Sequence, residues 1–157
     1  MSELRFRDFS HITVRVSDME RALAFYRDGL GLNAIFDVKL DGPGLEAVTG
    51  TKGASGRMVG LVVPGRGQVC IELLGFEQPK SEPLPRGRFT GYANISLSVD
   101  DLAAAHAACV ARGLRPLQAP VEVGGVKMFF LADPDGTPIE LIEFPRGATT
   151  SAAFNGV

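Results

Sequence analysis

Two carboxylates, an imidazole and an amide stand at matching places in two similar stretches of this sequence. His11 opens His-Ile-Thr-Val-Arg-Val-Ser-Asp, and Asn94 opens Asn-Ile-Ser-Leu-Ser-Val-Asp-Asp, which matches it in kind without a gap. Glu72 lies in Cys-Ile-Glu-Leu-Leu, and Glu140 lies in Pro-Ile-Glu-Leu-Ile. Such side chains can transfer protons or bind a cation. The two pairs indicate a duplicated module with a polar site where the copies meet.

Glu72 and Glu140 are the most informative of these residues, because each stands between hydrophobic neighbours in a predicted strand. A carboxylate on the inner face of a strand is costly unless it is paired or hydrogen-bonded. Arg15 and Lys127 are the partners that would give the carboxylates a purely structural role. A bound divalent cation explains both carboxylates at once, because it would neutralise and orient them.

The elements that position these residues follow from hydrophobic periodicity. Residues 10–17 alternate polar and apolar side chains, which predicts a strand with one face on a core. Ser17 and Glu20 form a capping box, so a helix is expected to start there and to stop at Gly29 and Gly31. The first half continues with predicted strands at 33–40, 57–63 and 68–74, and a helical turn at 45–48.

The second half repeats this order. A strand is predicted at 94–99, followed by a helix that Asp100 or Asp101 caps and that ends at Gly113. Strands are then predicted near 115–121, at 126–132 and at 137–144, the last two joined by an Asp-Pro-Asp-Gly turn. We therefore divide the chain into a first module at 8–76, a proline-containing linker at 77–92, a second module at 93–145 and a frayed tail at 146–157.

Each half is a strand–helix–three-strand unit, βαβββ, so the fold class is α+β. Such a unit leaves the sheet face opposite its helix uncovered. Two units in tandem, side by side or against another chain, can cover that face as a curved, cup-shaped mixed sheet with the helices outside. The period of two residues then predicts the side chains that line the cup: His11, Thr13, Arg15, Cys70, Glu72, Leu74, Asn94, Ser96, Ser98, Pro138, Glu140 and Ile142.

Composition excludes several classes of function. Hydrophobic residues make up 45% and charged residues 22% of the chain, and the formal net charge is −2, so neither disorder nor binding to nucleic acid is expected. No apolar run reaches the roughly 18 residues of a membrane span, and the N-terminus lacks a secretory core, which favours a cytoplasmic location. The two cysteines, Cys70 and Cys109, are expected to be packed thiols rather than a disulfide.

At these motifs the chain resembles the vicinal-oxygen-chelate (VOC) superfamily. Its members include glyoxalase I, methylmalonyl-CoA epimerase, extradiol dioxygenases, thiol-transferring fosfomycin resistance proteins and bleomycin-sequestering proteins. The resemblance spans residues 9–144. It is carried by the opening octet with Ala-Leu-Ala-Phe-Tyr-Arg-Asp-Gly-Leu-Gly-Leu, by Ile-Glu-Leu, and by Asp-Pro-Asp-Gly-Thr-Pro-Ile-Glu-Leu.

The resemblance implies a metal in the cup, with ligands from the first and last strand of each module: His11, Glu72, Asn94 and Glu140. His11, Glu72 and Glu140 suit the pattern of the glyoxalase-like and epimerase-like members, which usually have histidine where Asn94 stands. An amide oxygen can bind a hard cation. Asn94 is therefore interpreted as a ligand, as a donor beside three protein ligands, or as the mark of a lost metal. The expected cofactor is a divalent ion: Mg, Mn, Co, Ni or Zn.

The activity that the resemblance implies is that of a metal-dependent lyase or isomerase, with Glu72 and Glu140 as the catalytic groups. Its substrate would be a small oxygen-chelating molecule, of the kind used by glyoxalase I or an acyl-CoA epimerase. The alternative is a non-catalytic protein of the bleomycin-resistance type that sequesters a drug or metabolite. An extradiol dioxygenase is disfavoured, because one imidazole of its facial triad is missing. The resemblance also implies a homodimer.

Overall fold

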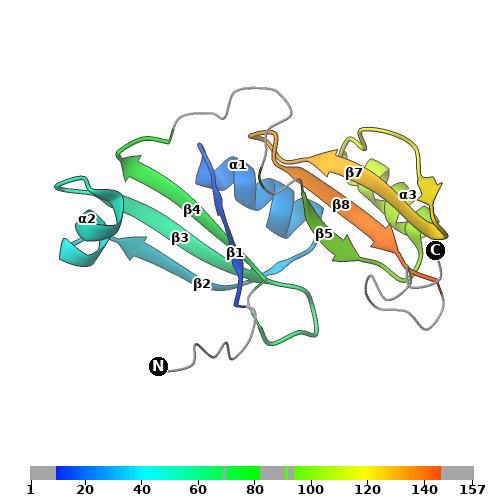
Figure 1. Cartoon of the computed structure of the whole chain (residues 1–157), viewed down its shortest axis with the longest axis horizontal. Helices are drawn as coiled ribbons and strands as arrows, with labels where there is room; N and C mark the ends of the chain where they lie inside the picture. Colours follow the sequence, from blue (N-terminus) through cyan, green and yellow to red (C-terminus); the bar gives the residue numbers. More distant parts are fainter. Residues whose placement is uncertain (1–9, 69, 82–90, 92–93, 146–157) are drawn as a thin grey trace, which may run out of the picture. The chain divides into compact units, whose positions relative to one another are not determined.

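The computed structural model describes residues 10–68, 70–81, 91 and 94–145. It consists of two compact units, Met1–Leu84 and Pro85–Val157, each of which is described by itself (Figure 1). Most of the linker predicted at 77–92, and the whole tail predicted at 146–157, lie outside the described residues. Among the described residues, no helix is long and apolar enough to cross a bilayer.

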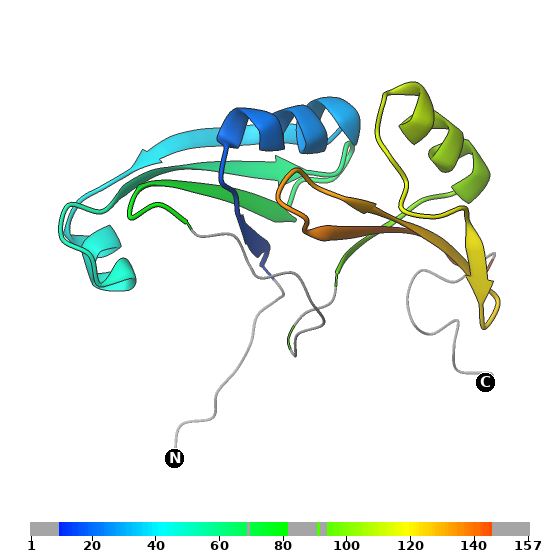
Figure 2. The same ribbon diagram turned by 90° about the horizontal axis from the view of Figure 1, so that it is seen from above.

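The first unit is a four-stranded mixed sheet with a helix on one face (Figure 2). Its elements are β1 (Ile12–Arg15), α1 (Met19–Leu23), which continues as the π-helix η1 (Ala24–Gly29), β2 (Asn33–Leu40), α2 (Pro43–Thr49), β3 (Ser55–Val62) and β4 (Ile71–Gln78). The strand order is β1-β4-β3-β2. The edge strand β1 is parallel to β4, and the other neighbours are antiparallel.

The second unit repeats this topology, with its helix again over one face of the sheet (Figure 2). Its elements are β5 (Ile95–Ser98), α3 (Leu102–Ala111), β6 (Val121–Val123), β7 (Val126–Ala132) and β8 (Pro138–Glu143). The strand order is β5-β8-β7-β6, with β5 parallel to β8. The α+β class and the tandem βαβββ modules are therefore confirmed, whereas the cup that they would form together stays a prediction.

An aspartate caps the main helix of each unit. Asp18 accepts a hydrogen bond from the backbone N–H of Arg21 at 3.0 Å, and Asp101 accepts one from Ala104 at 2.9 Å. The prediction that Ser17 caps the first helix is wrong by one residue, because the extended Asp18 is the residue whose side chain meets the N–H three positions on. Asp101 is one of the two caps predicted for the second helix.

Two strands, β6 and β4, differ most from their predicted bounds. β6 covers only Val121–Val123, although a strand was predicted near 115–121. Pro116 and Pro120 have no N–H to donate to a neighbouring strand, so regular pairing starts only after them. β4 runs later than the predicted 68–74, because the antiparallel register brings Leu61 of β3 opposite Ile71.

The core of each unit lies between its helix and its sheet. In the first unit, the side chains that are at most 3% exposed include Val14, Val16, Leu23, Tyr26, Leu61 and Leu73. In the second unit, they include Leu102, Phe129, Leu131 and Ile139. Because side chains alternate along a strand, the polar residues between these apolar ones point to the opposite face of each sheet.

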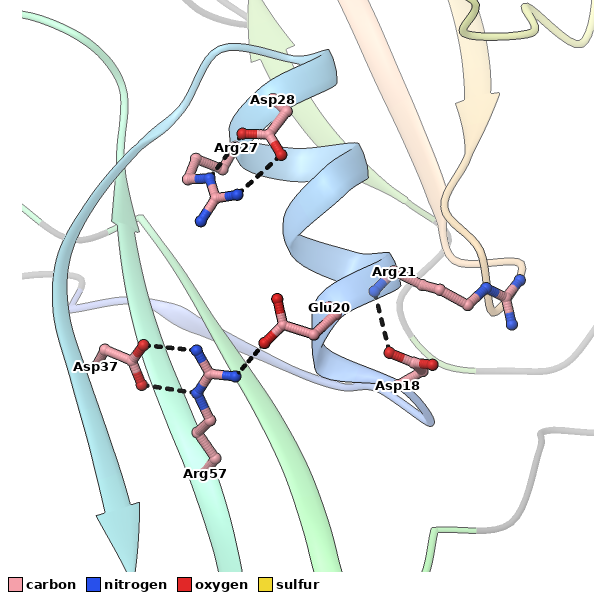
Figure 3. A network of polar contacts seen from close by, with 7 residues as sticks. All are labelled: Asp18, Glu20, Arg21, Arg27, Asp28, Asp37 and Arg57. Carbon is pink, nitrogen blue, oxygen red and sulfur yellow. Dashed lines mark hydrogen bonds and ion pairs between the residues drawn. The ribbon is translucent and has the colours of Figure 1, made fainter.

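Arg57 ties the helix of the first unit to its sheet (Figure 3). Its Nε and Nη2 atoms donate to the two carboxylate oxygens of Asp37 on β2, at 2.8 and 2.6 Å. Its Nη1 atom donates to Glu20 of α1 at 2.5 Å. The hydrogen bonds from the guanidinium lower the pKa of the Asp37 carboxyl, so this pair is charged at neutral pH.

Glu143 makes the corresponding connection in the second unit. This carboxylate on β8 accepts a hydrogen bond from the backbone N–H of Leu102, the first residue of α3, at 2.7 Å. It also accepts one from Nζ of Lys127 on β7 at 3.1 Å. Both bonds lower the pKa of Glu143, the bond from the helix N-terminus more strongly.

Candidate functional site

The polar group of the first unit forms where β1 and β4 run side by side. Thr13 of β1 stands opposite Glu72 of β4 in the parallel register, and His11 immediately precedes β1. Nε2 of His11 lies 3.0 Å from Oε2 of Glu72, and the Thr13 hydroxyl donates to the same oxygen at 3.5 Å. Ser10 Oγ lies 2.9 Å from the other ring nitrogen, Nδ1 of His11. The imidazole is therefore held between a hydroxyl and a carboxylate.

The chemistry of the His11–Glu72 pair fits a divalent cation. Ligand atoms about 2.1 Å from an ion and at right angles to each other lie about 3 Å apart. The 3.0 Å between Nε2 and Oε2 has this value. Nε2 can release its proton and offer a lone pair, while a hydroxyl on Nδ1 would orient the ring. Among the described residues, however, no three His, Cys, Asp or Glu side chains gather in one group.

The polar group of the second unit occupies the matching place between β5 and β8. Ser96 of β5 stands opposite Glu140 of β8, and Asn94 immediately precedes β5. Nδ2 of Asn94 donates to Oε2 of Glu140 at 3.1 Å, and the Ser96 hydroxyl donates to the same oxygen. Glu140 is only 9% exposed. Burial raises the pKa of its carboxyl, and the hydrogen bond from Asn94 acts in the opposite direction.

The sequence-predicted site residues thus come together in pairs. His11 meets Glu72 within the first unit, and Asn94 meets Glu140 within the second. The pairs occupy equivalent register positions, because Thr13 faces Glu72 as Ser96 faces Glu140. The arrangement of all four residues around one ion stays a prediction.

The two cations that could have given the carboxylates a structural role are engaged elsewhere. The Arg15 guanidinium lies over the ring of Phe76, 5.4 Å from its centroid. Lys127 pairs with Glu143, on the helix side of β8, at 3.1 Å. Neither cation forms an ion pair with Glu72 or Glu140 among the described residues. This leaves the two carboxylates with the neighbours named above and supports a role for them in a site.

Sequence reasoning missed an aromatic side chain that covers Gly60, the register partner of Glu72. Gly60 of β3 is the register partner of Glu72 on one side and of Phe36 of β2 on the other. A Cβ atom added to Gly60 would lie 2.1 Å from Cε1 of the Phe36 ring, so this ring lies across β3 toward β4. A glycine inside a strand, away from any turn, is the signal that could have revealed this close approach.

Comparison with known proteins identifies the family. The family model of the Glyoxalase/Bleomycin resistance protein/Dioxygenase superfamily matches residues 8–141. The chain is also 31% identical over 141 residues to the uncharacterized protein YaeR of Escherichia coli K12, with 89% of this chain and 98% of that protein covered. The chain therefore belongs to this superfamily, the VOC superfamily that its motifs resemble.

Solved structures agree with this assignment. A member of the same superfamily from Sphaerobacter thermophilus is 30% identical, with a TM-score of 0.65 and coverage of 89% of this chain and 99% of that one. A glyoxalase-family protein from Bacillus cereus has a TM-score of 0.76 at 20% identity, covering 91% and 97%. The trypanothione-dependent glyoxalase I of Leishmania major has a TM-score of 0.59 at 24% identity, covering 88% and 87%. The last two likenesses concern the fold alone.

Proposed function

We propose that this protein is a divalent-metal-dependent lyase or isomerase that acts on a small substrate with neighbouring oxygen atoms. The observation that carries the proposal is the pair of His11 and Glu72, whose Nε2 and Oε2 atoms are 3.0 Å apart. This spacing suits two ligands of one cation. Glu140, a buried carboxylate at the equivalent place of the second module, supports the proposal because it adds a second group able to exchange a proton.

The proposed protein ligands are His11, Glu72 and Glu140, and Asn94 stands at the fourth position predicted from the sequence, either as a ligand or as a donor beside three protein ligands. The cation would be Mg, Mn, Co, Ni or Zn. When bound, it supplies a Lewis acid that stabilises negative charge developing on a substrate oxygen. The His11 ring is oriented by Ser10 at Nδ1, which leaves Nε2 directed at the carboxylate of Glu72.

The two carboxylates carry the proposed proton transfer. One accepts at an Oε atom the proton from the carbon beside the substrate carbonyl, and the other returns a proton. Carboxylates in different surroundings suit opposite roles. Glu72 adjoins an imidazole, whereas Glu140 adjoins an amide and a hydroxyl.

Solvent proton exchange tests the proposal. Protein loaded with Mn²⁺ or Mg²⁺ is incubated in D₂O with a hemithioacetal, an α-hydroxy ketone and a 2-methyl-acyl thioester, and deuterium uptake is followed by NMR. We expect uptake to require the metal and to be lost in Glu72→Gln and Glu140→Gln. Glu143→Gln is the matched control, because Glu143 lies on the same strand but on the helix side. Unchanged uptake after metal removal would overturn the proposal.

One observation favours the rival function, a protein that sequesters a small molecule without catalysis. Asn94 and Ser96 satisfy Glu140 with neutral donors, so that this carboxylate has partners without a cation. Metal content and melting temperature discriminate the two functions. If neither the metal content nor the shift of the melting temperature on metal addition changes in Glu72→Gln and Glu140→Gln, the sequestering function is favoured. A metal-dependent rise in melting temperature that both substitutions abolish favours the enzyme.

The proposal includes a homodimer in the cytoplasm. Cys70 and Cys109 are both free thiols, and Cys109 is buried, which suits a reducing compartment. Light scattering after size-exclusion chromatography tests the assembly, with a mass twice the 16.7 kDa of one chain as the expected result.

A further inference from the structure

We propose that Asn94 acts together with Ser96 as a positioning pair for Glu140 and is not itself a metal ligand. This inference rests on the proposed function for the role of Glu140. It assigns the positioning of the Glu140 carboxylate to Asn94, which immediately precedes β5, and to Ser96 on β5. The evidence for the proposal is the identity of the atoms through which Asn94, Ser96 and Glu140 face each other.

The first step is the orientation of the Asn94 amide. Its Nδ2 atom lies 3.1 Å from Oε2 of Glu140 and 3.2 Å from Oγ of Ser96. An ionised carboxylate only accepts hydrogen bonds, so the amide must present its nitrogen to Glu140 and turn its oxygen away. Two ligands of one ion instead direct lone pairs toward the same point. The atom of Asn94 that meets Glu140 is therefore a donor and not a ligand.

Comparison with His11 sharpens this step. In the first unit the atom that meets Glu72 is Nε2 of an imidazole, which can lose its proton and offer a lone pair. An amide NH₂ group has no such option at ordinary pH. The substitution of asparagine for histidine at the repeated position thus keeps a hydrogen-bond donor toward the carboxylate and removes a metal ligand.

The second step is the distribution of bonds over the carboxylate. Asn94 and Ser96 both donate to Oε2 of Glu140. Among the described residues, no hydrogen bond is made to Oε1. Two donors on one oxygen fix the plane and the direction of the carboxylate, and they leave Oε1 for a cation or for a substrate proton. Loss of either donor would let the buried carboxylate rotate, even though the carboxylate itself is still present.

A double-mutant cycle on Mn²⁺ affinity tests the proposal. Asn94→Ala is combined with Glu140→Met, which keeps the length of the side chain but removes both acceptor oxygens. If Asn94 acts through Glu140, Asn94→Ala lowers Mn²⁺ affinity by about 10- to 100-fold in the natural protein and has no effect in the Glu140→Met background. An equal loss in both backgrounds would make Asn94 a ligand and overturn the proposal.

Kinetics give the second readout. Asn94→Ala and Ser96→Ala should lower kcat for proton exchange by about 10-fold or more while KM changes little, because the base is misplaced and the substrate-binding groups remain. Asn94→His should keep kcat close to that of the natural protein, since an imidazole N–H can donate to Glu140 in place of the amide. Glu143→Gln, on the helix side of β8, is the matched control and should leave kcat unchanged. Asn94→Asp keeps an oxygen ligand but loses the donor, so full activity in Asn94→Asp would contradict the proposal.

A metal-free measurement separates this proposal from the proposed function. If the natural protein neither binds Mn²⁺ nor exchanges protons, the proposed function fails. The pairing is then decided by urea unfolding of the same four proteins: the natural chain, both single variants and the double variant. Strongly non-additive stabilities support the pair, and additive stabilities overturn it.

Discussion

The two units have the same strand order and register but surround their carboxylates with different chemistry. Glu72 meets an imidazole, whereas Glu140 meets an amide and a hydroxyl. In both units the apolar residues of the two parallel strands keep their alternation and their burial. The comparison teaches that the two units share their strand order and register although the polar residue ahead of the first strand differs.

A second difference concerns the register position next to each carboxylate. The register partner of Glu72 on β3 is Gly60, which Phe36 of β2 covers. The register partner of Glu140 on β7 is Phe130 itself. In the second unit the edge strand β6 pairs only with residues 126–128 of β7. It does not reach Phe130 and therefore provides no equivalent of Phe36. The register position next to the carboxylate is thus a glycine covered by a ring in the first unit and an aromatic residue in the second.

The largest effect, a loss of Mn²⁺ affinity, is expected from a substitution at His11. His11→Asn makes the first unit like the second, and it should lower Mn²⁺ affinity by more than about 100-fold, because a direct ligand is lost. Isothermal titration with Mn²⁺ measures the change. Thr13→Ser, which brings the neighbouring position to the residue of the second unit, is the control and should retain the affinity. An affinity for Mn²⁺ that survives His11→Asn would remove the metal from the His11–Glu72 pair.

Gly60→Ala tests whether Phe36 is the reason that this position of β3 requires glycine. The new Cβ atom would overlap the Phe36 ring, which must swing away, and we expect a loss of about 1–3 kcal/mol in the free energy of unfolding. Urea denaturation measures this loss. In a Phe36→Ala background the same substitution should cost much less, because the ring is gone. An equal cost in both backgrounds would mean that the strand backbone, and not the ring, requires glycine.

Sequence periodicity predicted which face each residue of the paired strands would take, and it predicted β2 and β7 at their observed bounds. Period-two alternation is a local property of the backbone, so it survives without knowledge of the neighbours. It could not predict that the Ser96 hydroxyl meets Glu140, or that Phe36 crosses Gly60. Those contacts depend on strand register and side-chain rotamers across residues that are distant in the sequence.

The same limit explains the errors at the element ends. The capping box at Ser17 has the required residue types, yet Asp18 also has a capping side chain, and the backbone conformation decides between them. The short β6 follows from two prolines whose effect on pairing depends on which edge of the sheet they occupy. The role of Asn94 was open in the sequence for a related reason, because residue type alone does not fix which end of an amide faces Glu140.

Glu140→Gln probes the cost of keeping a buried carboxylate in the second unit. The pKa of Glu140 is raised on folding. The protonated carboxyl therefore stabilises the native state below the ordinary carboxyl pKa, and this stabilisation is lost as the pH rises through the pKa of Glu140 in the folded protein. Glu140→Gln should therefore be more stable than the natural protein at pH 7, by about 0.5–2 kcal/mol, and not at pH 4. Thermal melts at both pH values measure this.

Glu143→Gln is the matched variant on the same strand, and its sign should be opposite. The pKa of Glu143 is lowered by the N–H of Leu102 and by Lys127, so its contribution is present above the ordinary carboxyl pKa and lost as the pH falls. Glu143→Gln should therefore destabilise the protein at pH 7 and approach the natural stability in acid. Two variants with the same pH dependence would contradict the different roles of the two faces of β8.

The smallest effect is expected at Arg57, which connects the helix of the first unit to its sheet. Arg57→Met removes both the Asp37 and the Glu20 contacts of an exposed network, for which a loss of about 0.5–1 kcal/mol is typical. Because the pKa of Asp37 is lowered by Arg57, this contribution is present at neutral pH and is lost as the pH falls through the acid range. Added salt should reduce it as well. Urea melts of the natural protein and Arg57→Met at low and high salt measure the difference, and a salt-independent difference would mean that the aliphatic stem of Arg57, and not its charge, ties the helix to the sheet.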